Sequence, residues 1–135
     1  NVYCVSPAAG KFMGVLQFRK LSPSDEGRQR QAALLAFSAF SELKHIFLVD
    51  EDVDCFDLSD VIWAMNTRMQ GDVDIITIPG VRCHPLDPSN DPSCSPSIRD
   101  HGIACKTIFD CTVPYDQKHR FVRSRFMEVD PEKWL

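Results

Sequence analysis

The sequence lacks a basic surplus, a long apolar run and an N-terminal leader. Its 135 residues carry a net charge of -4, and the basic residues are scattered, whereas nucleic-acid-binding domains usually gather positive charge on one face. No apolar stretch approaches the roughly 20 residues that a membrane-spanning helix needs. No charged-then-apolar leader opens the chain. We therefore expect neither a nucleic acid nor a membrane as partner.

The cysteines also lack any regular spacing. They are Cys4, Cys55, Cys83, Cys94, Cys105 and Cys111. No pair has the form C-x-x-C, and the spacings of Cys83, Cys94 and Cys105 relative to His84 and His101 match no common zinc pattern. We expect six free thiols, no metal site and a reduced, cytoplasmic protein.

The composition is that of an ordinary globular domain, with 44% apolar and 25% charged residues. The length fits a single domain over 1–135, but it is short for a catalytic unit that binds a cofactor. The first residue is Asn1 rather than Met. We therefore expect this domain to be a segment of a longer protein.

Four apolar runs have the length of β-strands: segments 11–19, 45–50, 73–78 and 106–111. The run 45–50 is apolar up to its terminal Asp50, which predicts a central strand covered on both faces. Pro79 and Gly80 are expected to end the third strand.

Two helices are expected between these runs. Ser22-Pro23-Ser24-Asp25 has the form of a capping box that opens a helix reaching about Leu43, with one apolar face formed by Ala33, Ala36, Phe37 and Phe40. Asp57 or Ser59 is expected to cap a second helix, whose apolar side carries Val61, Ile62, Met65 and Met69. Strands that alternate with helices predict an α/β domain with a mostly parallel sheet flanked by helices.

The acidic segment 50–54 directly follows the predicted central strand, at the position where open α/β sheets place ligands. An EF-hand loop is excluded because its sixth and twelfth positions would be Cys55 and Val61. Asp50 and Asp52 fit the D-x-D pattern of metal-dependent phosphotransfer or glycosyl transfer. They equally fit a solvated acidic turn whose carboxylates cap the next helix and pair with a nearby arginine.

A second polar group lies in the proline-rich loop 80–88, where Arg82, Cys83 and His84 are consecutive. A guanidinium matches both oxygens of a carboxylate, and an imidazole can exchange protons near neutral pH. The alternative is that His84 only packs in a turn.

Segments 48–75 and 80–88 together resemble the UbiD decarboxylase family. The matching features are the acidic strand end, the Asp60-Val61-Ile62-Trp63-Ala64 helix with Thr67-Arg68, the x-Pro-Leu-x-Pro loop at 85–88 and the strand 106–112. The resemblance covers most of the chain from about Lys44 to Thr112. It identifies the chain as similar to the C-terminal domain of these enzymes.

The resemblance implies a carboxy-lyase that acts on aromatic or unsaturated acids. Such enzymes use prenylated flavin mononucleotide, with a divalent metal and a monovalent cation, and the flavin adds to the substrate before carbon dioxide leaves. The cofactor and a glutamate-arginine-glutamate catalytic network are implied to belong to a preceding domain, so no catalytic residue is expected in this segment. The C-terminal domain is implied to mediate homo-oligomer contacts and to close part of the substrate pocket.

Within that pocket the resemblance assigns Arg82, Cys83 and His84 to substrate binding. Relatives that act on cinnamate-like acids carry an aromatic residue where His84 stands, so a polar side chain favours phenolic acids such as hydroxybenzoates. Two alternatives remain open: a non-catalytic interaction module, and the D-x-D metal-dependent transferase.

Overall fold

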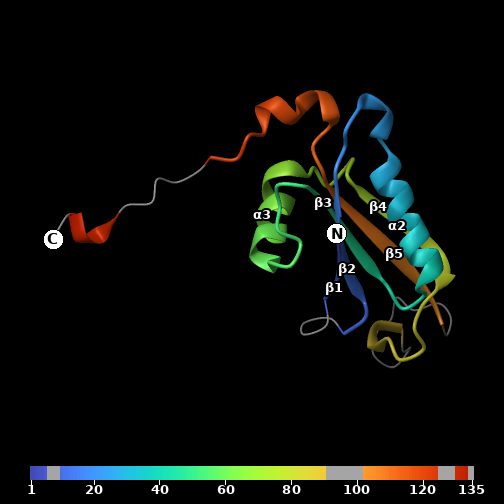
Figure 1. Cartoon of the computed structure of the whole chain (residues 1–135). Helices are drawn as coiled ribbons and strands as arrows, with labels where there is room; N and C mark the ends of the chain where they lie inside the picture. Colours follow the sequence, from blue (N-terminus) through green and yellow to red (C-terminus); the bar gives the residue numbers. More distant parts are fainter. Residues whose placement is uncertain (6–9, 91–101, 125–129, 134–135) are drawn as a thin grey trace.

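The computed structural model describes residues 1–5, 10–90, 102–124 and 130–133. Five strands form one sheet: β1 (Val2–Cys4), β2 (Met13–Phe18), β3 (His45–Asp50), β4 (Ile75–Arg82) and β5 (Ile103–Cys111). Helix α2 (Arg28–Ala39) and helix α3 (Leu58–Arg68) lie on opposite faces of this sheet (Figure 1). The short 3-10 helices are η1 (Pro23–Asp25), η2 (Pro88–Asn90), η3 (Tyr115–Arg120) and η4 (Pro131–Lys133).

The strand order is β1-β2-β3-β5-β4. The three inner strands are parallel, since β3 pairs in parallel with both β2 and β5. The two outer strands, β1 and β4, run antiparallel to their neighbours. The predicted α/β domain is confirmed, with parallel pairing at the centre of a mixed sheet and antiparallel pairing at its edges.

Strand β3 forms the middle of the core, as its unbroken apolar sequence predicts. Ile46 and Leu48 pack with the α2 side of the sheet, whereas Phe47 and Val49 pack with the α3 side. Leu48 is fully buried and Phe47 is 8% exposed. A strand covered on both faces needs apolar side chains at every position, so the prediction of a central strand here is confirmed.

Helix α2 begins later than predicted. The capping box at Asp25 does form, because Asp25 Oδ2 accepts the N–H groups of Leu21 (2.8 Å) and Ser22 (3.2 Å), but it opens only η1. Gly27 then has a φ of 83°, in the left-handed region that favours glycine, and this residue separates η1 from α2. Of the predicted apolar face, Ala33 and Phe37 are buried, while Phe40 lies beyond the helix end.

Helix α3 has the predicted cap, because Asp57 accepts the N–H of Ser59 at 2.9 Å. Its buried residues include Val61 and Ala64, which face β3 and β5. Ile62, predicted on the apolar side, is 44% exposed. The buried stripe is therefore narrower than the sequence pattern suggests.

The prediction that Pro79 and Gly80 end the third strand is wrong. Strand β4 continues through them to Arg82, and its register against β5 shifts between Ile78 and Val81. Proline cannot donate to a ladder, but an edge strand at a bulge tolerates it. Among the described residues β4 pairs with β5 alone, so Pro79 and Gly80 form a bulge instead of a terminus.

Five cysteines are free thiols in the part of the chain that the structure describes: Cys4, Cys55, Cys83, Cys105 and Cys111. Cys94 lies outside the described residues. The described helices include none long and apolar enough to cross a bilayer.

Candidate functional site

The two polar groups found in the sequence lie at opposite ends of the strands. We call these ends the carboxyl edge and the amino edge of the sheet, after the direction of its parallel strands. Asp50 is the last residue of β3, so the acidic turn follows the carboxyl edge of the parallel strands. Arg82 pairs with Ile103, the first residue of β5, so the loop that follows it lies at the amino edge. The two groups therefore cannot form one site.

At the carboxyl edge the acidic turn is organised around Arg68, the last residue of α3. Its guanidinium lies 3.0 Å from Asp50 Oδ2, and its two terminal nitrogens lie 2.8 Å and 2.6 Å from the two oxygens of Asp52. The side chains of Arg68 and Asp50 are 2% and 4% exposed. Both carboxylates of the D-x-D pattern are therefore bound to an internal cation.

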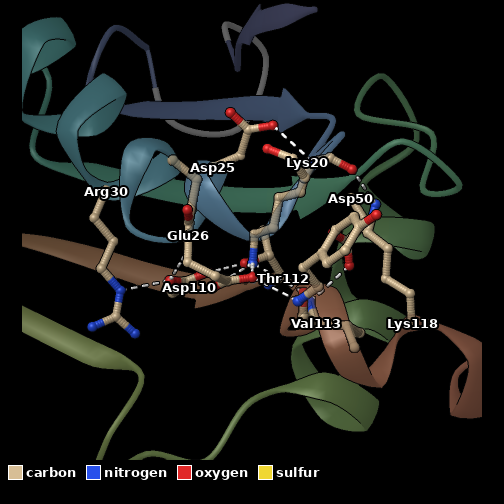
Figure 2. Close-up of polar contacts among 12 residues, drawn as sticks. Lys20, Asp25, Glu26, Arg30, Asp50, Asp110, Thr112, Val113 and Lys118 are labelled. Carbon is tan, nitrogen blue, oxygen red and sulfur yellow. Dashed lines mark hydrogen bonds and ion pairs between the residues drawn. The ribbon is translucent and has the colours of Figure 1, made fainter.

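The same edge holds the chain where it leaves β5 (Figure 2). Lys20 Nζ donates to the Val113 carbonyl at 2.9 Å, and the Val113 N–H donates to Asp50 Oδ2 at 2.8 Å. Asp110 Oδ2 accepts from Arg30 Nε at 2.7 Å, and its other oxygen accepts from the Thr112 hydroxyl at 2.6 Å. These contacts from buried polar groups fix the direction of the segment that follows β5.

The local electrostatics agree with a structural role for this edge. Burial raises the pKa of Asp50 above its ordinary value, although the Val113 N–H and Arg68 oppose the shift. The hydrogen bonds from Arg68 lower the pKa of Asp52.

A cavity of about 650 Å³ lies beside the turn, and the cations that line it are already paired with Asp52, Glu51 and Asp60. Among the described residues no group of three or more His, Cys, Asp or Glu side chains is placed to hold a metal ion. The acidic turn is thus paired with an arginine, as one of the two interpretations of its sequence expected.

At the amino edge, both ring nitrogens of His84 have partners. The Leu86 N–H donates to His84 Nδ1 at 3.1 Å, and His84 Nε2 lies 3.3 Å from Glu42 Oε1. The Phe12 ring stands edge-on to the imidazole, with 6.1 Å between ring centroids. His84 therefore sits in a turn and also presents Nε2 to a carboxylate from the α2–β3 connection.

The neighbours of His84 point in other directions. Cys83 is buried, its sulfur lies 3.0 Å from the side-chain amide of Asn90, and burial raises the pKa of its thiol. That amide is best oriented with its nitrogen donating to the Ile103 carbonyl and its oxygen accepting from the Gly102 N–H, both at 2.8 Å. The Arg82 side chain is exposed and lies over Gly102. The three consecutive residues thus do not converge on one point in this chain.

The loop is stiffened by more than its prolines. Asp87 is buried, and its carboxylate lies 2.9 Å from Lys44 Nζ and accepts the Ser89 N–H at 3.0 Å. Burial opposes ionisation of this carboxyl, but the hydrogen bonds from Lys44 and Ser89 lower its pKa on balance. Lys44 and Glu42, two residues apart, therefore both contact the loop. Neither was predicted, because the sequence gives no sign that the α2–β3 connection meets a loop some forty residues later.

Known proteins resemble this chain in sequence and in fold. A family model described as the C-terminal domain of 3-octaprenyl-4-hydroxybenzoate carboxy-lyase, UbiD, matches residues 1–111. The chain belongs to the UbiD C-terminal domain family. It is 56% identical to gallate decarboxylase of Lactiplantibacillus plantarum over 137 aligned residues, which cover 100% of this chain and 28% of that protein.

Solved structures show the same UbiD domain. The apo structure of a 3,4-dihydroxybenzoic acid decarboxylase from Enterobacter cloacae matches with a TM-score of 0.86 and 63% identity, over 99% of this chain and 27% of that one. The UbiD-class enzyme HmfF from Pelotomaculum thermopropionicum, solved in complex with FMN, matches with a TM-score of 0.80 and 27% identity, over 100% of this chain and 28% of that one. This UbiD domain therefore spans a little over a quarter of the relatives that it matches. The family resemblance read from the sequence is confirmed.

Proposed function

We propose that this domain is the oligomerisation and substrate-pocket part of a prenylated-FMN-dependent decarboxylase that acts on hydroxybenzoate-like acids. The observation that carries the proposal is the 56% identity to gallate decarboxylase along 100% of the chain. The likeness to a 3,4-dihydroxybenzoic acid decarboxylase, at 63% identity, supports the same substrate class. Both relatives are named for phenolic acids, the class that a polar residue at His84 favours.

The loop after β4 is the part of this domain that we assign to the pocket, with Arg82, Cys83 and His84 as its residues. Lys44 and Asp87 hold the loop in place, so a side chain exposed on it loses little further entropy when it meets a substrate. Because Cys83 is buried against Asn90, its role in the proposal is to support the loop. His84 has 23% of its side chain exposed and is the residue that we propose to contact a ring substituent.

The proposed flavin would supply the electron sink that a carbanion needs on loss of carbon dioxide, which side chains supply poorly. The described residues do not offer the divalent-metal site that would accompany it. Following the family resemblance, we place the flavin, the divalent metal, the monovalent cation and the glutamate-arginine-glutamate network in a preceding domain. This chain's own task is to orient the substrate and exclude water.

The proposed homo-oligomer has a surface to use on α2. Leu34 and Leu35 are 47% and 70% exposed on this helix, and contiguous exposed apolar surface can mark a site of protein–protein contact. The proposed location is the cytoplasm, because free cysteines such as Cys4 and Cys105, both exposed, persist as thiols in a reducing compartment.

The experiment is an assay of the full-length protein, reconstituted with prenylated FMN, for carbon dioxide release from gallate and 3,4-dihydroxybenzoate. We expect turnover of at least one of them. We expect no turnover and no tight flavin binding by the 135-residue chain alone, because we place the flavin in the preceding domain. Turnover by the chain alone would contradict the proposed division of labour. A full-length protein inactive on every aromatic acid tested would contradict the function itself and leave the interaction module as the better description.

The D-x-D transferase is not proposed, because Asp50 and Asp52 both bind Arg68. A metal would have to displace a buried guanidinium to reach them.

A further inference from the structure

The His84–Glu42 pair combines a hydrogen-bond donor and an acceptor at one point. Since His84 Nδ1 accepts the Leu86 N–H, a neutral imidazole in this position carries its proton on Nε2. That nitrogen lies 3.3 Å from Glu42 Oε1. The two side chains are 23% and 21% exposed, so a small group can reach both of them.

Glu42 is held in place from several sides. Its other carboxylate oxygen lies 3.2 Å from Lys11 Nζ. The next residue in the chain, Leu43, is buried in the core. The residue after it, Lys44, binds Asp87, which lies in the same loop as His84. The carboxylate is therefore a fixed part of the surface around His84, although it comes from a different segment.

We infer that Glu42 is a substrate-recognition residue which, together with His84, selects a ring hydroxyl over a ring ether. The inference rests on the proposed function, since it names the group that discriminates between substrates of that enzyme. A hydroxyl is both a donor and an acceptor. Inserted between the two side chains, it accepts from His84 Nε2–H and donates to the Glu42 carboxylate.

The direct contact between the two side chains gives way easily. A distance of 3.3 Å lies beyond the usual range of an N–H···O bond, so little is lost when a hydroxyl separates them. A methoxy group has no proton to donate. It would satisfy His84 but leave the Glu42 carboxylate desolvated against a methyl group, and sites built around a hydroxyl reject analogues that leave a polar group unpaired.

The test uses the full-length enzyme and its variants Glu42→Ala and Glu42→Gln. The measured quantity is the ratio of kcat/KM for 3,4-dihydroxybenzoate to kcat/KM for 4-hydroxy-3-methoxybenzoate. We expect Glu42→Ala to lower this ratio by about tenfold or more, the usual scale for loss of a hydrogen bond to a charged group. We expect Glu42→Gln to lower it as well, because an amide can turn its NH₂ toward an ether oxygen. If Glu42→Ala does not fold, the ratio measured for Glu42→Gln alone tests the inference.

Glu51→Gln is the matched control. Glu51 is also a partly exposed glutamate paired with a lysine, Lys118, but at the opposite edge of the sheet. We expect this variant to keep the ratio of the parent enzyme. A fall as large as that of Glu42→Gln would mean that any lost carboxylate alters selectivity, and the inference would be wrong.

A second readout does not depend on turnover. In ¹⁵N spectra of the 135-residue chain we expect the neutral His84 ring to carry its proton on Nε2, facing Glu42. A proton on Nδ1 would overturn the inference, because Nε2 could then donate to nothing. An unchanged ratio in both Glu42 variants of an active enzyme would overturn it too, while leaving the proposed function intact. A parent enzyme inactive on all aromatic acids would remove the proposed function and this inference together, whereas the spectra would still report whether the pair exists.

Discussion

Replacing Arg68 by alanine should destabilise the domain strongly, because it removes the cation that pairs with two carboxylates. Asp50 has a side-chain exposure of only 4%, and without Arg68 its nearest remaining hydrogen-bond donor is the Val113 N–H. Removing one member of a buried ion pair costs about 3–5 kcal/mol, because the other charge stays buried without its partner. The contact of the Arg68 guanidinium with the Trp63 ring, 5.1 Å from its centroid, is lost as well.

The expected fall in melting temperature follows from the size of the chain. An unfolding entropy of about 2.1 cal/mol/K per residue gives about 280 cal/mol/K for 135 residues. Each kcal/mol then corresponds to about 3.5 °C, so a loss of 3–5 kcal/mol predicts a fall of about 11–18 °C. Differential scanning calorimetry at pH 7.5 measures this directly.

The loss should shrink as the pH falls. Burial already raises the pKa of Asp50 in the folded chain, and removal of Arg68 raises it further. The folded state then binds more protons than the unfolded state between the ordinary pKa of 3.8 and the raised value, so stability in that window increases as the pH decreases. Asp52 acts in the same direction. In the parent chain Arg68 lowers the pKa of Asp52, which stabilises the folded state at neutral pH. This stabilisation is lost as the pH falls through the folded pKa of Asp52.

Arg28→Ala is the matched control, because Arg28 also pairs with an aspartate but has 64% of its side chain exposed. Its partner Asp25 keeps the Leu21 and Ser22 N–H groups, so no carboxylate is left without a donor. A loss at Arg68 no larger than that at Arg28, or one that does not shrink as the pH falls toward the ordinary aspartate pKa of 3.8, would refute the reasoning. Adding Asp50→Asn to Arg68→Ala should recover part of the loss, because the uncompensated charge is then gone.

Three further predictions concern the core, the thiols and the pocket loop. Leu48→Ala should cost about 2–5 kcal/mol in urea unfolding, since Leu48 is fully buried; a cost below 1 kcal/mol would mean that the core is not centred on β3. In thiol titration the exposed Cys4 and Cys105 should react in the native chain, whereas Cys111, whose pKa burial raises to about 12, should react only after unfolding. In the full-length enzyme His84→Phe should reduce the preference for hydroxylated over non-hydroxylated acids, and an unchanged preference would identify His84 as a packing residue.

The sequence predicted the centre of the fold better than its edges. β3 was recognised because burial on both faces requires an unbroken apolar run, and no other local structure of that length explains it as well. The prediction for the end of β4 was wrong because a Pro-Gly pair such as Pro79-Gly80 is typical of the end of a strand. Only the tertiary fact that β4 is an edge strand, where a missing N–H is tolerated, allows the strand to continue.

The site shows the same division between local and long-range information. The polar composition of the loop around His84 was visible in the sequence, as was the acidic turn. The partners of these residues were not visible. Glu42 and His84 belong to separate segments, and their contact forms only on folding, so residue spacing in the sequence does not indicate it. For the acidic turn a nearby arginine was expected, but only the structure shows that Arg68 binds Asp50 and Asp52 together.

The bulge in β4 bears on how copies of this protein can associate. An edge strand with a regular row of free N–H and C=O groups invites the same strand of another molecule to extend the sheet, which is a route to fibres and aggregates. In β4 the ladder is interrupted at Pro79 and Gly80, and at the opposite edge β1 is only three residues long. Neither edge is a good template for growth. A stable assembly of this domain should therefore use side chains on the helices and leave the number of strands in each sheet unchanged.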